Sequence, residues 1–220
     1  MLTDVESKQI FDKIIEKRIK NIEDYSDICI DNQYFVREFF DMGEEEIFVD
    51  CGAFDGDTIS RFLRLTDGKF KGIHAFEPSP ENFSRLYKAY SKHHNIRLYN
   101  KGVYNLNSVL HFKQFQENMA GSRINEKGSV SVEVVKIDDV IQEQVTFIKM
   151  DVEGSELKAL EGAKDTIATN KPKLAICLYH KLEDLWQIPL YVNGIDPNYK
   201  MYIRHHNYNI WETVLYAVVL

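Results

Sequence analysis

Three features of the sequence predict an α/β domain built on a mostly parallel sheet. Short apolar runs that suit buried strands alternate with longer amphipathic segments that suit helices. The stretch 47–58, I-F-V-D-C-G-A-F-D-G-D-T, passes from a strand through a glycine turn into a helix. Near the C-terminus, the runs 200–204 and 213–219 flank a polar segment and can pair as an antiparallel hairpin. The expected sheet is therefore parallel with an antiparallel terminal strand.

Composition excludes several classes of function. The net charge of −7 over 220 residues, without a block of Lys and Arg, argues against a nucleic-acid-binding face. The sequence contains no uninterrupted apolar run of about 18 residues, so no integral membrane segment is expected. Cys29, Cys51 and Cys177 lie far apart without a C-x-x-C pair, which argues against a disulfide framework or a structural zinc site. We therefore expect a cytoplasmic protein.

The first 42 residues are expected to form a helical extension to the domain at 43–220. Segment 5–22 predicts an amphipathic helix whose apolar face carries Ile10, Phe11, Ile14, Ile15, Ile19 and Ile22. A second short helix at 32–41 would turn Tyr34, Phe35, Phe39 and Phe40 toward the core. The extension could cover a ligand cleft, pair with another subunit in a homo-oligomer, or simply pack on the domain edge.

The remaining elements follow from hydrophobic periodicity and from turn residues. Strands are expected at 47–49, 72–76, 96–99, 145–152 and 173–179, and helices at 58–65, 80–93, 154–163 and within 182–197. Short alternating runs at 109–112 and 130–137 predict a β-hairpin inserted between the third and fourth of these strands, with a polar loop at 117–128. Asp138 and Asp139 would cap the next helix or turn.

The negative charge of the loop after the first strand indicates which ligand the loop binds. A pyrophosphate loop needs closely spaced glycines and little negative charge, whereas here Gly52 and Gly56 are four apart and Asp50, Asp55 and Asp57 lie in or beside the loop. Three carboxylates suit a ligand with an ammonium and a sulfonium, while backbone N–H groups remain for its carboxylate. S-adenosylmethionine fits this description. A solvated acidic turn or a divalent-metal loop are the alternatives.

Three further acidic residues and one histidine follow later strands. Glu77 ends the second strand, where a carboxylate can accept both hydroxyls of a ribose. Asp151 and Glu153 follow the fourth strand, and His180 follows the fifth. Because the carboxyl ends of parallel strands meet at one edge of a sheet, these side chains are candidates for a common crevice.

Four segments of the sequence resemble the FkbM-type methyltransferases from about Phe48 to the C-terminus. They are F-V-D-C-G-A-F-D-G-D-T (48–58), F-E-P-S-P-E-N-F (76–83), I-K-M-D-V-E-G-S-E-L-K-A-L-E-G-A (148–163) and E-T-V-L-Y-A (212–217). The resemblance implies a Rossmann-like class I methyltransferase fold and S-adenosylmethionine-dependent O-methylation of a hydroxyl on a sugar, glycan precursor or secondary metabolite. The residues expected to bind the cofactor are Asp50, Gly52, Ala53, Asp55, Gly56, Asp57, Thr58, Glu77, Asp151 and Glu153.

Catalysis would rest on positioning and on a general base that removes the hydroxyl proton. His180 suits that role by its reference pKa near 6.5, with Asp151 as a competing base; a strand-end histidine bonded to a backbone carbonyl is the alternative reading of His180. No metal is predicted, because neighbouring residues on a strand such as His205 and His206 point to opposite faces. A non-catalytic S-adenosylmethionine-binding protein remains the alternative function, and an NAD-type dehydrogenase is disfavoured by the glycine spacing.

Overall fold

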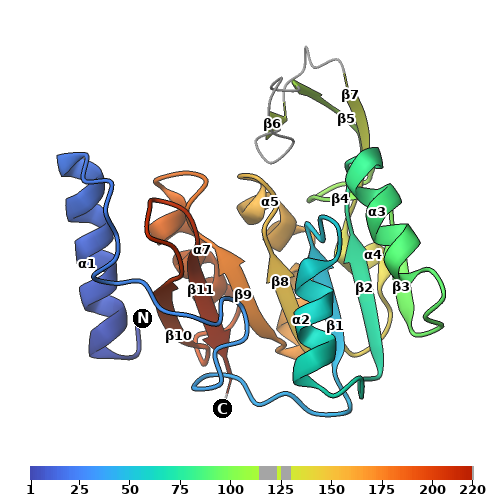
Figure 1. Cartoon of the computed structure of the whole chain (residues 1–220), viewed down its shortest axis with the longest axis horizontal. Helices are drawn as coiled ribbons and strands as arrows, with labels where there is room; N and C mark the ends of the chain where they lie inside the picture. The colour runs from blue at the N-terminus through green and yellow to red at the C-terminus, as the bar shows by residue number, and fades with distance from the viewer. Residues whose placement is uncertain (114–122, 125–129, 220) are drawn as a thin grey trace. The chain divides into compact units, whose positions relative to one another are not determined.

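The computed structural model describes residues 1–113, 123–124 and 130–219, and divides the chain into two compact units. The central unit is Met42–Asn170, and the terminal unit combines Met1–Asp41 with Lys171–Leu220. Each unit is built around its own run of neighbouring strands (Figure 1).

Four parallel strands form the core of the central unit, in the order β8-β1-β2-β3. They are β1 (Ile47–Cys51), β2 (Gly72–Phe76), β3 (Ile96–Tyr99) and β8 (Phe147–Met150). All five residues of β1 are buried, as expected of a parallel strand that is covered on both faces. The rings of Phe48 and Phe147 stack with centroids 5.0 Å apart, and Phe62 packs on Phe48 at 4.9 Å.

The helices among the described residues of this unit are α2 (Asp57–Leu65), α3 (Pro80–Tyr90), α4 (Ile137–Val140), α5 (Glu156–Glu161) and α6 (Lys164–Asn170). Helix α3 begins where its sequence indicates, because Ser79 caps its N-terminus by accepting from the N–H of Asn82 and Pro80 is the first helical residue. Asp138, expected to cap the next helix or turn, instead accepts hydrogen bonds from the backbone of Asp165 and Thr166 in α6.

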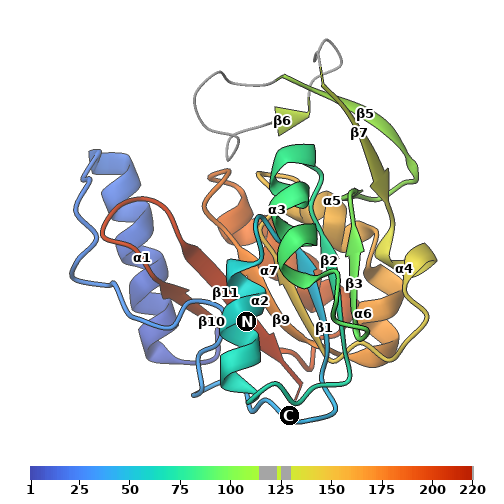
Figure 2. The same ribbon diagram turned by 45° about the vertical axis from the view of Figure 1, so that its right-hand side comes forward.

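A second sheet in the central unit has the order β4-β7-β5-β6. Its strands are β4 (Gly102–Val103), β5 (Ser108–Lys113), β6 (Arg123–Ile124) and β7 (Val130–Val135). Strands β5 and β7 pair antiparallel and confirm the inserted hairpin, which extends past α3 in Figure 2. Apart from β6, the polar loop at 117–128 lies outside the described residues.

The terminal unit contains the antiparallel strands β10-β11-β9 and two helices. They are α1 (Val5–Lys20), β9 (Lys173–Cys177), α7 (Asp184–Ile195), β10 (Lys200–His205) and β11 (Thr213–Val218). The predicted terminal hairpin is confirmed. Helix α1 lies along β10, where Ser7 accepts from the N–H of Ile203 and Arg204 pairs with Asp4, the N-cap of α1. Ile10 and Ile14 are buried, but Ile19 at the end of the helix is 76% exposed.

The prediction of a helix at 32–41 is wrong. The segment forms turns, and Asn32 and Tyr34 have φ values of 66° and 67°, which a right-handed helix cannot contain. The N–H of Tyr34 donates instead to the hydroxyl of Tyr216 in β11, 2.9 Å away. The expected burial of the aromatic residues is nevertheless confirmed for Tyr34, Phe35, Phe39 and Phe40.

Candidate functional site

Three loops of the central unit leave the sheet at one edge. Cys51 pairs with Phe76 of β2 and with Met150 of β8, so the segments 52–58, 77–79 and 151–156 begin side by side. We call these three segments the carboxyl edge. All ten residues predicted to bind the cofactor belong to the central unit, and all except Asp50 lie on the carboxyl edge itself. Ligands of open α/β sheets commonly bind at this edge.

Gly52 makes the first turn of the carboxyl edge and leaves no room for a side chain. Its φ is +81°, and a Cβ atom at this position would lie 1.8 Å from the carbonyl oxygen of Asp151. The N–H groups of Gly52 and Ala53 both donate to the carbonyl of Phe76, each at 3.0 Å. In turn, the N–H of Asp151 donates to the carbonyl of Cys51. The turn therefore links all three strand ends through the backbone.

A buried ion pair lies beneath this turn. Asp50 is completely buried, and the Nζ atom of Lys149 lies 3.0 Å from its Oδ1 atom. The same ammonium donates to the carbonyl oxygen of Gly52 at 2.7 Å. Burial raises the pKa of Asp50 to about 6, although the positive charge of Lys149 acts in the opposite direction.

The position of Asp50 differs from that of the other residues predicted to bind the cofactor. Its side chain has no exposed surface, and its charge faces Lys149. Of the three loop carboxylates in the charge argument, Asp55 is half-buried and Asp57 is exposed, so these two remain on the open side. We therefore treat Asp50 as a support beneath the loop.

Glu77 ties two loops of the carboxyl edge together. Its Oε2 atom accepts from the N–H of Phe54 at 2.9 Å, and its Oε1 atom accepts from the N–H of Ser79 at 2.8 Å. The side chain is 6% exposed. Burial raises the pKa of Glu77, and the two backbone donors oppose that shift because they favour the ionised form. The side chain of Asn82 also hydrogen-bonds to this carboxylate, and the lone pair that these three donors leave can accept a ligand hydroxyl.

The N-terminus of α2 supplies the remaining backbone donors. Gly56, the N-cap of α2, has a φ of 92°, and its carbonyl accepts from the hydroxyl of Tyr90 at 2.9 Å. Within the described part of the chain, the N–H groups of Asp55, Asp57 and Thr58 have no acceptor. The N–H groups of Gly52, Ala53, Phe54 and Gly56 are used within the protein, so only part of the loop backbone is left for a ligand.

The turn between β8 and α5 carries Asp151 and Glu153, both half-buried. Glu153 and Gly154 have positive φ values of 55° and 87°. The buried carboxylate of Glu156 supports the turn by accepting from the N–H groups of Val152 at 2.9 Å and Gly154 at 3.3 Å. This support helps to hold the backbone of Asp151 and Glu153 at the carboxyl edge.

Sequence reasoning missed three supporting residues: Lys149, Tyr90 and Glu156. Lys149 could have been found, because it is a lysine within the apolar run V-T-F-I-K-M. A lysine in a buried strand requires an ion-pair or hydrogen-bond partner. Helical periodicity within 80–93 indicates that Tyr90 faces inward but does not indicate a partner for its hydroxyl. Nothing in the local pattern distinguishes Glu156 from an exposed residue in the first turn of a helix.

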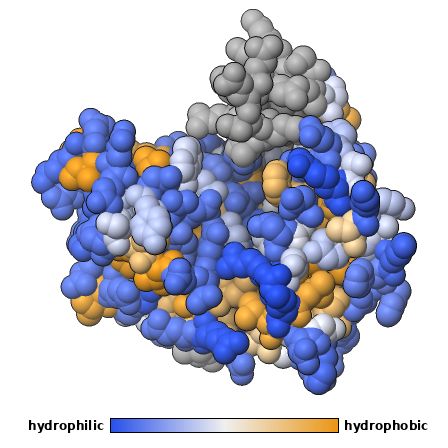
Figure 3. Space-filling model, in the orientation of Figure 1, coloured by the Kyte–Doolittle hydropathy of each residue, from blue (hydrophilic) through white to orange (hydrophobic). Residues whose placement is uncertain are grey.

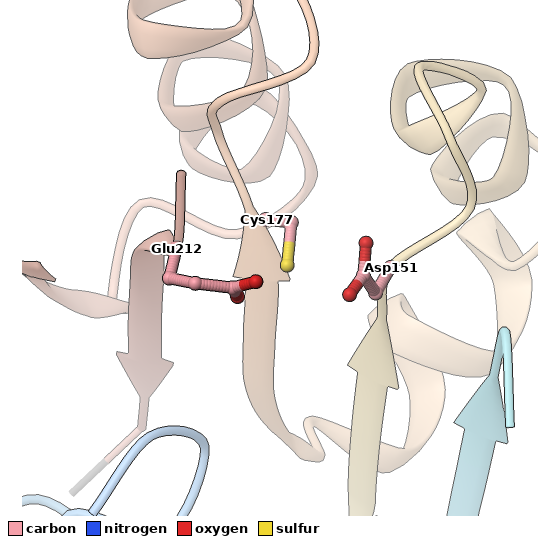
Figure 4. Close-up of side chains that lie close together, drawn as sticks. All are labelled: Asp151, Cys177 and Glu212. Atoms are coloured by element: carbon pink, nitrogen blue, oxygen red, sulfur yellow. The ribbon is translucent and has the colours of Figure 1, made fainter. Parts of the chain in front are cut away.

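His180, the predicted general base, belongs to the terminal unit and follows β9. It is partly exposed, and its ring lies 4.2 Å from that of Tyr179, which meets Trp211 edge-on at 5.8 Å. Figure 4 labels Cys177 at the end of β9 and Glu212 just before β11, both in the terminal unit, and Asp151 after β8 in the central unit. The catalytic roles of His180 and Asp151 stay predictions.

His205 and His206 are structural residues of the β10–β11 hairpin. His205 is completely buried, so it is not the polar turn surface that a hairpin tip suggests. Its Nδ1 atom lies 2.8 Å from the Thr213 hydroxyl and its Nε2 atom 2.8 Å from the carbonyl of Asn209. In His206, Nδ1 lies 3.0 Å from the carbonyl of Ile30 and Nε2 2.7 Å from the hydroxyl of Tyr216. Both imidazoles are therefore occupied by protein partners.

Among the described residues, no helix is both long and apolar enough to span a bilayer. The face in Figure 3 is mostly hydrophilic, with hydrophobic residues scattered over it.

Comparison with known proteins places these features in a family context. The family model for the methyltransferase FkbM domain matches residues 50–210. The crystal structure of a methyltransferase FkbM from Methylobacillus flagellatus is similar over 98% of this chain, with 30% sequence identity and a TM-score of 0.84. The match covers 56% of that structure's chain, so the present sequence spans little more than half the length of that relative. A search of curated proteins finds no significant match.

More distant structures share only the fold. An rRNA methylase from Streptococcus thermophilus is 16% identical, with a TM-score of 0.52 over 84% of this chain and 91% of its own. A protein of Streptococcus mutans, provisionally classed as a methyltransferase and crystallised with SAH, is 13% identical, with a TM-score of 0.51 over 84% of this chain and 93% of its own. These likenesses confirm the predicted α/β, Rossmann-like fold class with its mostly parallel sheet.

Proposed function

The chain belongs to the FkbM family of methyltransferases, and from that premise we propose that it transfers a methyl group from S-adenosylmethionine to a hydroxyl oxygen of a sugar, glycan precursor or secondary metabolite. The observation that carries the proposal is the carboxyl edge of the central unit. It combines a deeply set carboxylate, Glu77, with the N–H groups at the start of α2 and with the acidic side chains of Asp55 and Asp57.

The donor set of the carboxyl edge fits S-adenosylmethionine better than a dinucleotide. Glu77 would accept a ribose hydroxyl through the lone pair that its protein donors leave open. The N–H groups of Asp57 and Thr58 would receive the carboxylate of the cofactor, since a helix N-terminus favours an anion. Asp55, Asp57, Asp151 and Glu153 would attract its ammonium and would repel a pyrophosphate.

When bound, the cofactor supplies an electrophilic methyl group on its sulfonium. The protein would contribute by aligning the acceptor and by removing its proton. We propose that a ring nitrogen of His180 accepts the hydroxyl proton of the acceptor. His180 is partly exposed and follows β9. Asp151 would position the cofactor through its negative charge.

Cytoplasmic location is also proposed rather than shown. Cys29, Cys51 and Cys177 form no disulfide, and burial raises the pKa of the Cys51 thiol, which keeps it protonated and unreactive. Thiols that stay reduced suit a reducing compartment.

Incubation with methyl-labelled S-adenosylmethionine and a protein-free cell extract tests the proposed reaction. Label should appear in a small, alkali-stable product, because a methyl ether resists the hydrolysis that removes a methyl ester. A protein that binds S-adenosylhomocysteine but transfers no label from any extract would favour the non-catalytic alternative. Once the acceptor is known, His180→Ala should lower turnover by about two to four decades with little change in cofactor affinity, whereas the exposed His94→Ala should have no effect.

Glu77→Ala tests the ribose site. Loss of charge-assisted hydrogen bonds should weaken binding of S-adenosylhomocysteine by roughly ten- to a hundredfold. Because Glu77 also holds the N–H groups of Phe54 and Ser79, the variant should be less stable than the parent. Glu81→Ala, on the exposed first turn of α3, is the matched control. Unchanged affinity in Glu77→Ala would move the ribose site elsewhere.

A further inference from the structure

Lys149 is an unusual residue for its place in the fold. It lies in β8, whose four residues are all buried, and its own side chain is about as deeply buried as its apolar neighbours. An ammonium group in such a position is costly unless it is paired and hydrogen-bonded. The partner of Lys149 is set by the register of β1 and β8, which places Asp50 directly opposite it.

The ammonium of Lys149 makes two contacts of different kinds. One is the ion pair with Asp50, which cancels a buried negative charge; among the described residues, no other group donates a hydrogen bond to the carboxylate of Asp50. The other is the hydrogen bond of 2.7 Å to the carbonyl oxygen of Gly52. The first contact serves the stability of the core, whereas the second acts on the turn that opens the carboxyl edge.

Gly52 is held from several sides at once. Its N–H donates to Phe76 of β2, its carbonyl accepts from Lys149 of β8, and its Cα faces the carbonyl of Asp151 too closely for any side chain. The positive φ of Gly52 sets the direction in which the chain continues to Phe54, whose N–H reaches Glu77. A change in the orientation of the Gly52 peptide would therefore move the backbone that leads to Glu77 and to the start of α2.

We propose that Lys149 is a positioning residue for the cofactor: by holding the Gly52 carbonyl, it sets the shape of the 52–58 loop that binds S-adenosylmethionine. The inference rests on the proposed function, because it assigns Lys149 a part in the same site. Lys149 does not touch the ligand. It acts from beneath the loop, through the backbone of Gly52.

Separate variants distinguish positioning from charge neutralisation. Lys149→Met removes both contacts and leaves Asp50 buried without its partner. Asp50→Asn removes the ion pair and leaves the ammonium to hold the Gly52 carbonyl. The double variant Asp50→Asn/Lys149→Met removes both charges, so the core holds no unpaired ion while the Gly52 carbonyl still lacks its donor. Lys158→Met, which removes a partly exposed lysine paired with Glu161 on α5, is the matched control.

The experiment measures thermal unfolding and the affinity for S-adenosylhomocysteine by calorimetry in the full chain. We expect the double variant to unfold at a higher temperature than Lys149→Met, yet to bind roughly ten- to a hundredfold more weakly than the parent. Asp50→Asn should lose less affinity than Lys149→Met, and Lys158→Met should bind as the parent does.

The outcomes separate the inference from the function on which it rests. If the double variant recovers both stability and parental affinity, Lys149 only neutralises Asp50 and the inference is overturned while the proposed function stands. If the parent itself does not bind S-adenosylhomocysteine, the proposed function fails and the inference fails with it. If Lys149→Met is too unstable to purify, the double variant alone still decides between the two roles.

Discussion

The carboxyl edge of the central unit and the β10–β11 hairpin of the terminal unit both collect ionisable side chains, but they differ in how those side chains are bonded. In the hairpin, both nitrogens of His205 and of His206 lie at hydrogen-bonding distance from protein atoms. At the carboxyl edge, Glu77 retains a lone pair and the N–H groups of Asp57 and Thr58 retain their donor capacity.

This difference teaches how to rank candidate residues of similar chemistry. Two adjacent histidines suggest a metal site in a sequence. In this fold the imidazole of His205 instead bonds within the hairpin, and that of His206 joins the hairpin to the carbonyl of Ile30. Polar groups whose hydrogen bonds are used within the protein stabilise the fold, whereas groups with remaining capacity can receive a ligand. The predictions below test this division.

The largest expected effect is that of Gly52→Ala at the carboxyl edge. The left-handed backbone and the overlap with the Asp151 carbonyl should together lower the free energy of unfolding by about 2–5 kcal/mol. Gly43→Ala is the control, since nothing lies within 4 Å of a Cβ at that position. Urea unfolding of both variants checks the prediction. Equal stability would mean that the Gly52 turn is not as tight as described.

His205→Ala should be the next most damaging change, and it should act on stability alone. It removes a completely buried ring and leaves the buried Thr213 hydroxyl without its partner, at a cost of about 2–4 kcal/mol. Affinity for S-adenosylhomocysteine, measured on the folded variant, should stay within about twofold of the parent. A large loss of affinity with little loss of stability would give the hairpin histidine a functional part.

His74 predicts a moderate dependence of stability on pH in the central unit. Arg97 donates to its Nε2 atom and its Nδ1 atom lies 3.1 Å from the Tyr99 hydroxyl, an arrangement that requires neutral imidazole. Burial lowers the pKa of His74 to about 4. Because the pKa is lower in the folded state, the stabilisation is present above about pH 6.5 and is lost as the pH falls toward 4.

Urea unfolding between pH 7.5 and pH 4.5 checks this sign. The parent should lose more stability over that range than His74→Gln, whereas His94→Gln, at an exposed position, should follow the parent. A parent and a His74→Gln variant with parallel pH profiles would show that His74 does not supply the dependence.

The smallest effect is expected at the exposed Asp57 in the first turn of α2. Asp57→Asn should lower stability by about 0.3–1 kcal/mol, because a negative charge there is favoured by the helix dipole. Asp67→Asn, just beyond the other end of α2, should change stability little or slightly raise it. The difference between the variants should shrink at 1 M salt. Persistence at high salt would point to a specific contact of Asp57 instead.

The local sequence pattern was sufficient to predict several strands and the inserted hairpin. The strand predicted at 72–76 coincides with β2, and Glu77 follows it as expected, because a short apolar run ended by two prolines leaves little choice of structure. The inserted hairpin was also predictable from its alternating residues. The family resemblance predicted the fold class, which the comparisons confirm.

Features that depend on contacts between residues far apart in the sequence could not be predicted from the local pattern. The turns at 32–41 depend on the bond from Tyr34 to Tyr216, which lie 182 positions apart. The role of Asp50 depends on the register between β1 and β8, which places Lys149 opposite it. A glycine loop with three aspartates therefore looked like three ligand-facing charges, although one of them is neutralised beneath the loop.

Calorimetric titration of the parent protein with S-adenosylhomocysteine and, separately, with NAD distinguishes an S-adenosylmethionine site from a dinucleotide site. S-adenosylhomocysteine should bind at least about tenfold more tightly, because Glu77 accepts its ribose and the acidic side chains attract its ammonium while repelling a pyrophosphate. Equal affinity for the two ligands, or preference for NAD, would contradict the assignment of the carboxyl edge as an S-adenosylmethionine site.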